Sequence, residues 1–69
     1  MSDIEEWKEK TIERINEMMD YLDELKEEIS KMKDIEPTKR RNTIDCIDSA
    51  KLCLLELDIR IHFIDVEGV

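Results

Sequence analysis

Residues 43–66 carry apolar side chains on two sides of any helix that they form, and this excess most constrains the fold. One stripe, with steps of three and four, comprises Thr43, Ile47, Ala50, Leu54, Leu57, Ile61 and Ile64. A second stripe comprises Leu52, Leu55, Ile59, His62, Phe63 and Val66. At about 100° per residue the two stripes point in nearly opposite directions, so a helix of this kind must be covered on both sides.

The preceding residues supply the cover for one of these sides. A chain of 69 residues is one domain, so we take 1–69 as a single unit. A heptad pattern before the turn places one seam position at Ile4, Thr11, Met18, Leu25 and Met32, and its partner at Lys8, Ile15, Leu22 and Ile29. Pro37 disfavours helix in the residue before it and suits the first turn of a following helix. We therefore predict an all-α, coiled-coil-like antiparallel hairpin, with helices over about 3–33 and 38–65 and a turn at 34–37.

One segment also fits another secondary structure. Residues 55–63 alternate apolar and polar side chains, which is the pattern of a strand. The chain offers no second strand to pair with it, and an isolated strand is not stable. We therefore predict helix here, with an intermolecular strand as the alternative.

A two-helix hairpin leaves the second stripe without cover. Small domains with thin cores commonly gain stability by oligomerising. We therefore expect a homodimer that forms a four-helix bundle, with further assembly into a tetramer left open. The expected dimer interface consists of Leu52, Leu55, Ile59, Phe63 and Val66, together with Ile12, Met19 and Tyr21.

The charges are segregated along the chain. Residues 31–41 contain five bases and two acids, residues 1–30 eleven acids and four bases, and residues 42–69 six acids and two bases. The hairpin therefore has a basic turn and an acidic open end. Antiparallel packing of two hairpins would place each basic turn beside the acidic end of the other, and charge complementarity of this kind selects orientation.

A formal net charge of −8 bounds the function. It disfavours nucleic acid as a partner, and no apolar run is long enough to span a membrane. Because no nucleophile, phosphate-loop or zinc motif occurs, we expect a non-enzymatic protein–protein interaction or adaptor module without a cofactor. One alternative is an acidic inhibitor that mimics nucleic acid and binds a basic protein. Another is a nucleic-acid binder that uses the bases of the turn, namely Lys31, Lys33, Lys39, Arg40 and Arg41.

The chain starts with an acidic segment and has no secretion-type apolar run, so we expect a cytoplasmic protein. Cys46 and Cys53 lie about 10.5 Å apart along a helix, which is too far for a disulfide within the chain. We expect reduced, buried thiols with a structural role, and a disulfide between chains or a shared metal are the alternatives.

His62 is the only histidine, and on a helix it shares a face with Asp58 and Asp65. These three side chains could form a weak divalent-metal site. One histidine among so many acids is a common coincidence, so we predict no metal and a partly exposed histidine.

The layout resembles the small dimeric helical hairpins typified by the plasmid-encoded repressor-of-primer protein. The resemblance is one of architecture over the whole chain. Because it includes no shared motif, it carries over neither RNA binding nor any site residue.

Overall fold

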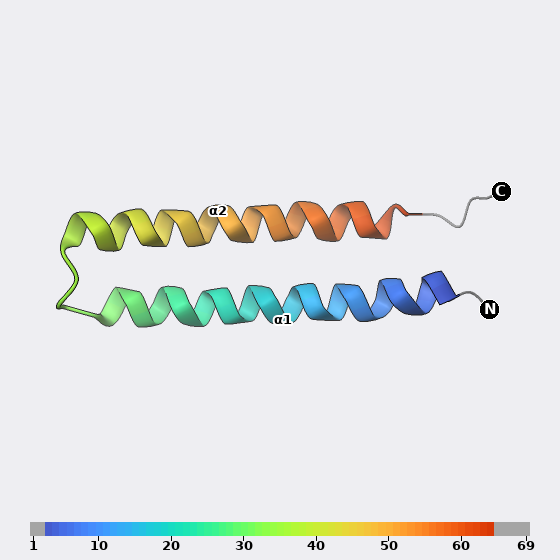
Figure 1. Cartoon of the computed structure of the whole chain (residues 1–69), viewed down its shortest axis with the longest axis horizontal. Helices are drawn as coiled ribbons and strands as arrows, with labels where there is room; N and C mark the ends of the chain where they lie inside the picture. The colour runs from blue at the N-terminus through green and yellow to red at the C-terminus, as the bar shows by residue number, and fades with distance from the viewer. Residues whose placement is uncertain (1–2, 65–69) are drawn as a thin grey trace.

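Two long helices joined by a short turn make up the part of the chain that the computed structural model describes, residues 3–64. Helix α1 spans Asp3–Lys31 and helix α2 spans Pro37–His62. They lie side by side and antiparallel, with the turn at one end of the hairpin (Figure 1). The Cα atoms extend over 55 × 15 × 9 Å, so the molecule is a rod only one helix thick. The predicted all-α hairpin is confirmed. Residues 55–62 belong to α2, so the alternative of a strand is wrong here.

Both helices end slightly earlier than the sequence pattern suggested. Helix α1 stops at Lys31 rather than near residue 33. Directly after this end, the Met32 amide donates to the Ile29 carbonyl over 3.2 Å. This bond spans three residues instead of four, so it tightens the last turn and directs the chain into the loop. Helix α2 ends at His62, and Phe63 caps it with its amide directed at the last carbonyls.

Pro37 fixes the start of α2. The residue before it, Glu36, is the N-cap, and its ψ of 138° is the extended backbone that a following proline enforces. The Glu36 carbonyl accepts the Arg40 amide over 2.9 Å as the first bond of the helix. Glu36 makes no capping bond with its side chain.

The most continuous burial on each helix follows a heptad, and we call these positions the interhelical seam. Beside the seam, Thr11, Leu25, Asp48 and Ala50 are also half-buried. On α1 the seam consists of Lys8, Ile12, Ile15, Met19, Leu22, Lys26 and Ile29. On α2 it consists of Arg40, Ile44, Ile47, Lys51, Leu54, Asp58 and Ile61. All fourteen are at least half-buried, but within residues 3–64 only Ile15, Ile47 and Ile61 are buried hydrophobic residues. The core of a single hairpin is therefore thin.

The seam of α1 matches half of the expected heptad. The predicted positions that include Ile15 and Leu22 face α2, as expected. Met18 and Met32 are exposed, however, while Ile12 and Met19 are half-buried in the seam. The apolar face of α1 is wider than a single neighbouring helix can cover, so the hairpin buries one edge of that face and leaves the other in solvent.

Lysines bridge the two helices at three levels. Lys26 Nζ donates to Asp48 over 2.8 Å, and Lys51 pairs with Asp23. At the open end, Lys8 Nζ donates to the carbonyls of residues 62 and 64 over 3.2 and 2.9 Å. A cation at this end of α2 neutralises the negative end of the helix dipole and helps to hold the two helices in register.

Candidate interaction surfaces

The residues that precede each seam position form a second apolar row along the hairpin. Each of these residues is turned about 100° from the seam. The two chains run in opposite directions, so one step back along each helix turns toward the same side of the hairpin. The preceding residues of both helices therefore face one side. We call this surface the Trp7 flank. From α1 it comprises Trp7, Thr11, Met18, Tyr21 and Leu25, and Met32 follows just beyond the helix. From α2 it comprises Thr43, Cys46, Ala50, Cys53, Leu57 and Ile64, the last just beyond the helix.

Most of the large side chains of the Trp7 flank are open to solvent, although Leu25 is half-buried. Tyr21 is 63% exposed and Trp7 49%, and Met18, Met32 and Leu57 are also exposed. An open depression of ≈ 480 Å³ lies on the α1 side of the flank and is lined by Arg14, Glu17, Met18 and Tyr21. Four charged residues, Arg14, Glu28, Lys39 and Arg60, complete the heptad of this flank. Contiguous apolar surface that runs over both helices is typical of a protein–protein contact.

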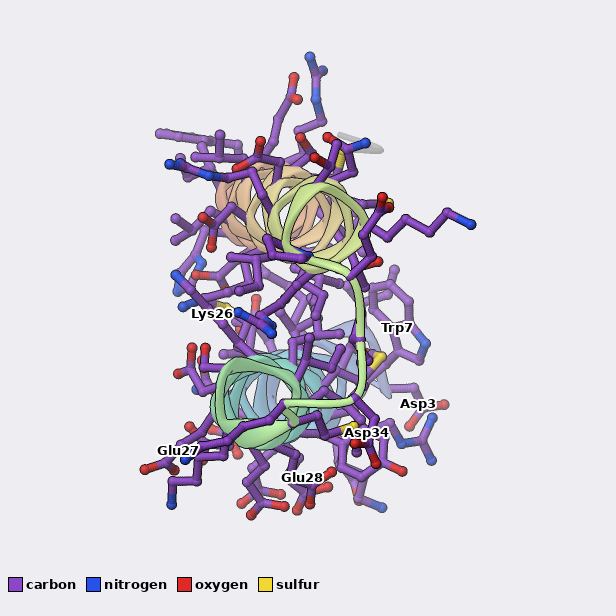
Figure 2. The ribbon with its side chains drawn as sticks, turned by 90° about the vertical axis from the view of Figure 1, so that its left-hand side faces the viewer. Asp3, Trp7, Lys26, Glu27, Glu28 and Asp34 are labelled. Atoms are coloured by element: carbon purple, nitrogen blue, oxygen red, sulfur yellow. The ribbon has the colours of Figure 1, made fainter. Side chains whose placement is uncertain are left out.

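The opposite side of the hairpin has a different character, and we call it the Leu52 flank. Figure 2 looks along the hairpin and shows Trp7 on one side of the two helices and Glu27 on the other. Helix α2 contributes Leu52, Leu55 and Ile59, and Leu52 is 66% exposed. Helix α1 contributes a row of acids, namely Glu9, Glu13, Asp20, Asp23 and Glu27. The Leu52 flank is therefore a narrow apolar strip beside an acidic helix face.

The residues of the expected dimer interface do not lie on one surface. Leu52, Leu55 and Ile59 share the Leu52 flank, whereas Tyr21 lies on the Trp7 flank. Ile12 and Met19 are half-buried in the interhelical seam, so α2 already covers part of each. Phe63 is 77% exposed at the cap of α2, and Val66 lies outside the described residues. The expected interface did not include Trp7, Met18 and Met32, which the structure leaves exposed. The seven-residue spacing of Met18 and Met32 with Leu25 marks these three as one row.

The five bases proposed for anion binding lie around the turn, and two of them have partners. Lys31 pairs with Glu27 one helical turn away, at 3.7 Å. Arg40 Nη2 donates to the Ile35 carbonyl over 2.9 Å, which ties the loop to α2. Lys33, Lys39 and Arg41 are exposed. An open hollow of ≈ 350 Å³ beside them is lined by Pro37, Arg40, Arg41, Ile44, Asp45 and Asp48. Its two carboxylates would compete with an anion for the arginines.

The environment of His62 is that of an exposed histidine within its own helix. Its Nδ1 lies 2.9 Å from the Asp58 carbonyl oxygen and 3.5 Å from the Asp58 carboxylate. Among residues 3–64 no three His, Cys, Asp or Glu side chains converge in a way that could hold a metal. Asp65, the third residue of the suggested site, lies outside the described range. The thiols of Cys46 and Cys53 are free and exposed, rather than buried as expected.

The ion pair between Lys26 and Asp48 gives one pH-dependent prediction. The hydrogen bond from Lys26 to Asp48, with the Asp48 charge, raises the pKa of Lys26 above 10.5. While Asp48 is ionised, the pair makes its full contribution to stability at any pH below the pKa that Lys26 has in the unfolded chain. That contribution is lost as the pH rises through the higher pKa that Lys26 has in the folded hairpin. We expect Asp48→Asn to lower the pKa of Lys26 in an NMR titration. An unchanged Lys26 pKa would show that the two side chains are not paired in solution.

Neither α1 nor α2 contains a stretch that is long and apolar enough to cross a membrane. Comparisons with known proteins gave no significant match to a protein-family model, a curated protein or a solved structure. The candidate function therefore follows from the two flanks of the hairpin themselves.

Proposed function

We propose that the chain is a small, non-enzymatic protein–protein interaction module that self-associates into a homodimeric four-helix bundle. The observation that carries the proposal is the imbalance between buried and exposed apolar groups. Within residues 3–64 three hydrophobic side chains are buried, whereas eleven large ones are exposed. Each helix has a single neighbour, and domains of this size commonly need a further source of stability. A second hairpin supplies it without a metal or a disulfide.

A dimer that covers one flank leaves the other available for a partner protein, as an adaptor requires. The Leu52 flank suits this second role because its apolar strip lies beside the acids of α1. Such a surface favours a basic amphipathic segment, with apolar side chains on Leu52, Leu55 and Ile59 and cations over the acidic row. Binding of a basic amphipathic peptide should weaken as salt is added, because exposed charges are screened.

Thermal unfolding at several protein concentrations tests the proposed self-association. If folding is coupled to dimerisation, mass action makes the midpoint of unfolding depend on concentration. For a dimer of two such chains we expect a rise of about 5 °C for each tenfold increase in concentration. Circular dichroism at the helical minimum measures the midpoint. A midpoint that stays constant over three such increases would contradict the proposal.

A further inference from the structure

We infer that the second copy docks antiparallel on the Trp7 flank, with the two-fold axis between Met18 and Tyr21 on α1 and near Leu55 on α2. This inference rests on the proposed self-association and specifies its surface and register. The Trp7 flank is the side of the hairpin on which both helices present apolar side chains. Two copies that meet there would bury four helices around one core, which is the arrangement of an antiparallel bundle.

The spacing along α1 selects a register for this contact. The flank residues recur along α1 at intervals of three and four residues. In an antiparallel pair, the order of these intervals along one helix must match the order read backwards along the other, so that the side chains interlock. One such match sets Met18 against Tyr21 of the second copy and Trp7 against Met32, so that large apolar groups meet. A slip of one heptad would set Met18 against Arg14, which is a poorer fit.

The spacing along α2 gives a register of its own. The same condition sets Leu57 against Cys53 of the second copy and Ile64 against Cys46. Small cysteines then lie opposite large aliphatic side chains, which is the volume complementarity that a packed core needs. The centre of this match is Leu55, midway between Cys53 and Leu57.

A rigid hairpin can satisfy both registers only if their centres lie at the same level. The bridge between Asp23 and Lys51 and the bridge between Lys26 and Asp48 fix the level of one helix against the other. Asp23 lies level with Lys51. Four residues before Asp23 and four residues after Lys51, Met19 lies level with Leu55. The α1 centre lies between Met18 and Tyr21, so the two centres agree within about two residues, or about 3 Å. The two independent registers are therefore compatible with one two-fold axis.

The charges favour the same orientation. In this register the basic turn of each copy, residues 31–41, lies beside the acidic first turn of α1 in the other. Asp3, Glu5 and Glu6 occupy that turn. Arg14 also comes within about one helical turn of Glu28 of the second copy. A parallel arrangement would instead place the two basic turns together. Repulsion between like charges at an interface disfavours that arrangement.

The two native cysteines distinguish these orientations. Relative to the axis near residue 55, Cys53 and its copy are offset by about 6 Å along the bundle, whereas Cys46 and its copy are offset by about 27 Å. In a parallel dimer on the same flank each cysteine would lie level with its own copy. In a dimer formed through the Leu52 flank, both cysteines would face away from the contact.

Cross-linking of two single-cysteine variants tests the inference. Cys46→Ser keeps Cys53, and Cys53→Ser keeps Cys46, so each variant is the matched control of the other. A bis-maleimide that spans less than half of the Cys46 offset should join most of the Cys53 chains into covalent dimers and almost none of the Cys46 chains. Circular dichroism and labelling with a monofunctional maleimide verify that both variants are helical and that both thiols react.

Sedimentation of the same variants separates the two ways in which the idea can fail. Cross-linking of both variants would overturn the antiparallel register, and cross-linking of neither in a sedimenting dimer would overturn the Trp7 flank as the contact. In both cases the proposed self-association would stand. Monomeric sedimentation of both variants and of the unmodified chain would overturn the self-association and the inference with it.

Discussion

The double substitution Met18→Glu and Tyr21→Glu is expected to convert the dimer into monomers. Both side chains lie on the Trp7 flank and line its open depression, so they sit beside the proposed axis. Two substitutions in each copy bring four carboxylates into the centre of the contact, where the one Arg14 of each copy beside the depression offsets only part of their desolvation. We expect the dissociation constant to rise at least about 100-fold, which corresponds to about 3 kcal/mol. Sedimentation velocity over a concentration series measures it.

The matched control carries the same two charges on the opposite flank. Leu52 and Ile59 are exposed there, so Leu52→Glu with Ile59→Glu should fold and keep the sedimentation behaviour of the unmodified chain. If this control dissociates while the Met18 and Tyr21 variant remains dimeric, the contact lies on the Leu52 flank, as the sequence pattern first suggested.

Ile15→Ala should be the most destabilising single substitution in the hairpin core. Ile15 is 1% exposed and is one of only three buried hydrophobic residues within 3–64. Truncation of such a side chain removes apolar burial and leaves a cavity, with an expected loss of about 3 kcal/mol per chain. Urea unfolding at a fixed protein concentration measures the loss.

The exposed Ile59 provides the comparison for this change. Ile59→Ala removes the same atoms from a side chain that is 54% exposed, so we expect a loss below about 1 kcal/mol. Equal losses for the two variants would show that burial in the seam does not distinguish the two positions. A much larger loss at Ile59 would indicate that this residue is buried in an assembly.

Local sequence signals were sufficient to predict the hairpin. Pro37 imposes an extended residue before it and suits a first helical turn, so the position of the loop follows from proline chemistry alone. The heptad that contains Ile15 and Leu22 predicted the buried edge of α1. The helix ends differed by two or three residues, because α1 closes with the three-residue bond at Met32 and α2 is capped at Phe63.

The assignment of residues to surfaces required the three-dimensional structure. The apolar face of α1 spans both Met18 and Met19, and periodicity does not reveal which of the two faces α2. The position of α1 along α2 is set by the ion pairs of Lys26 and Lys51 across the two helices. Both lysines lie in the seam, at positions where a pattern of apolar residues alone would not place a lysine. Once Met19 is half-buried against α2, Met18 and Tyr21 must face the same side as Trp7.

The mass of the unmodified chain in solution tests the central claim most directly. One chain has a mass of 8.3 kDa, so sedimentation equilibrium at micromolar concentration should return twice this value if the exposed apolar flank is covered by a second copy. A mass of 8.3 kDa that persists to the highest concentration at which the protein stays in solution would contradict the account.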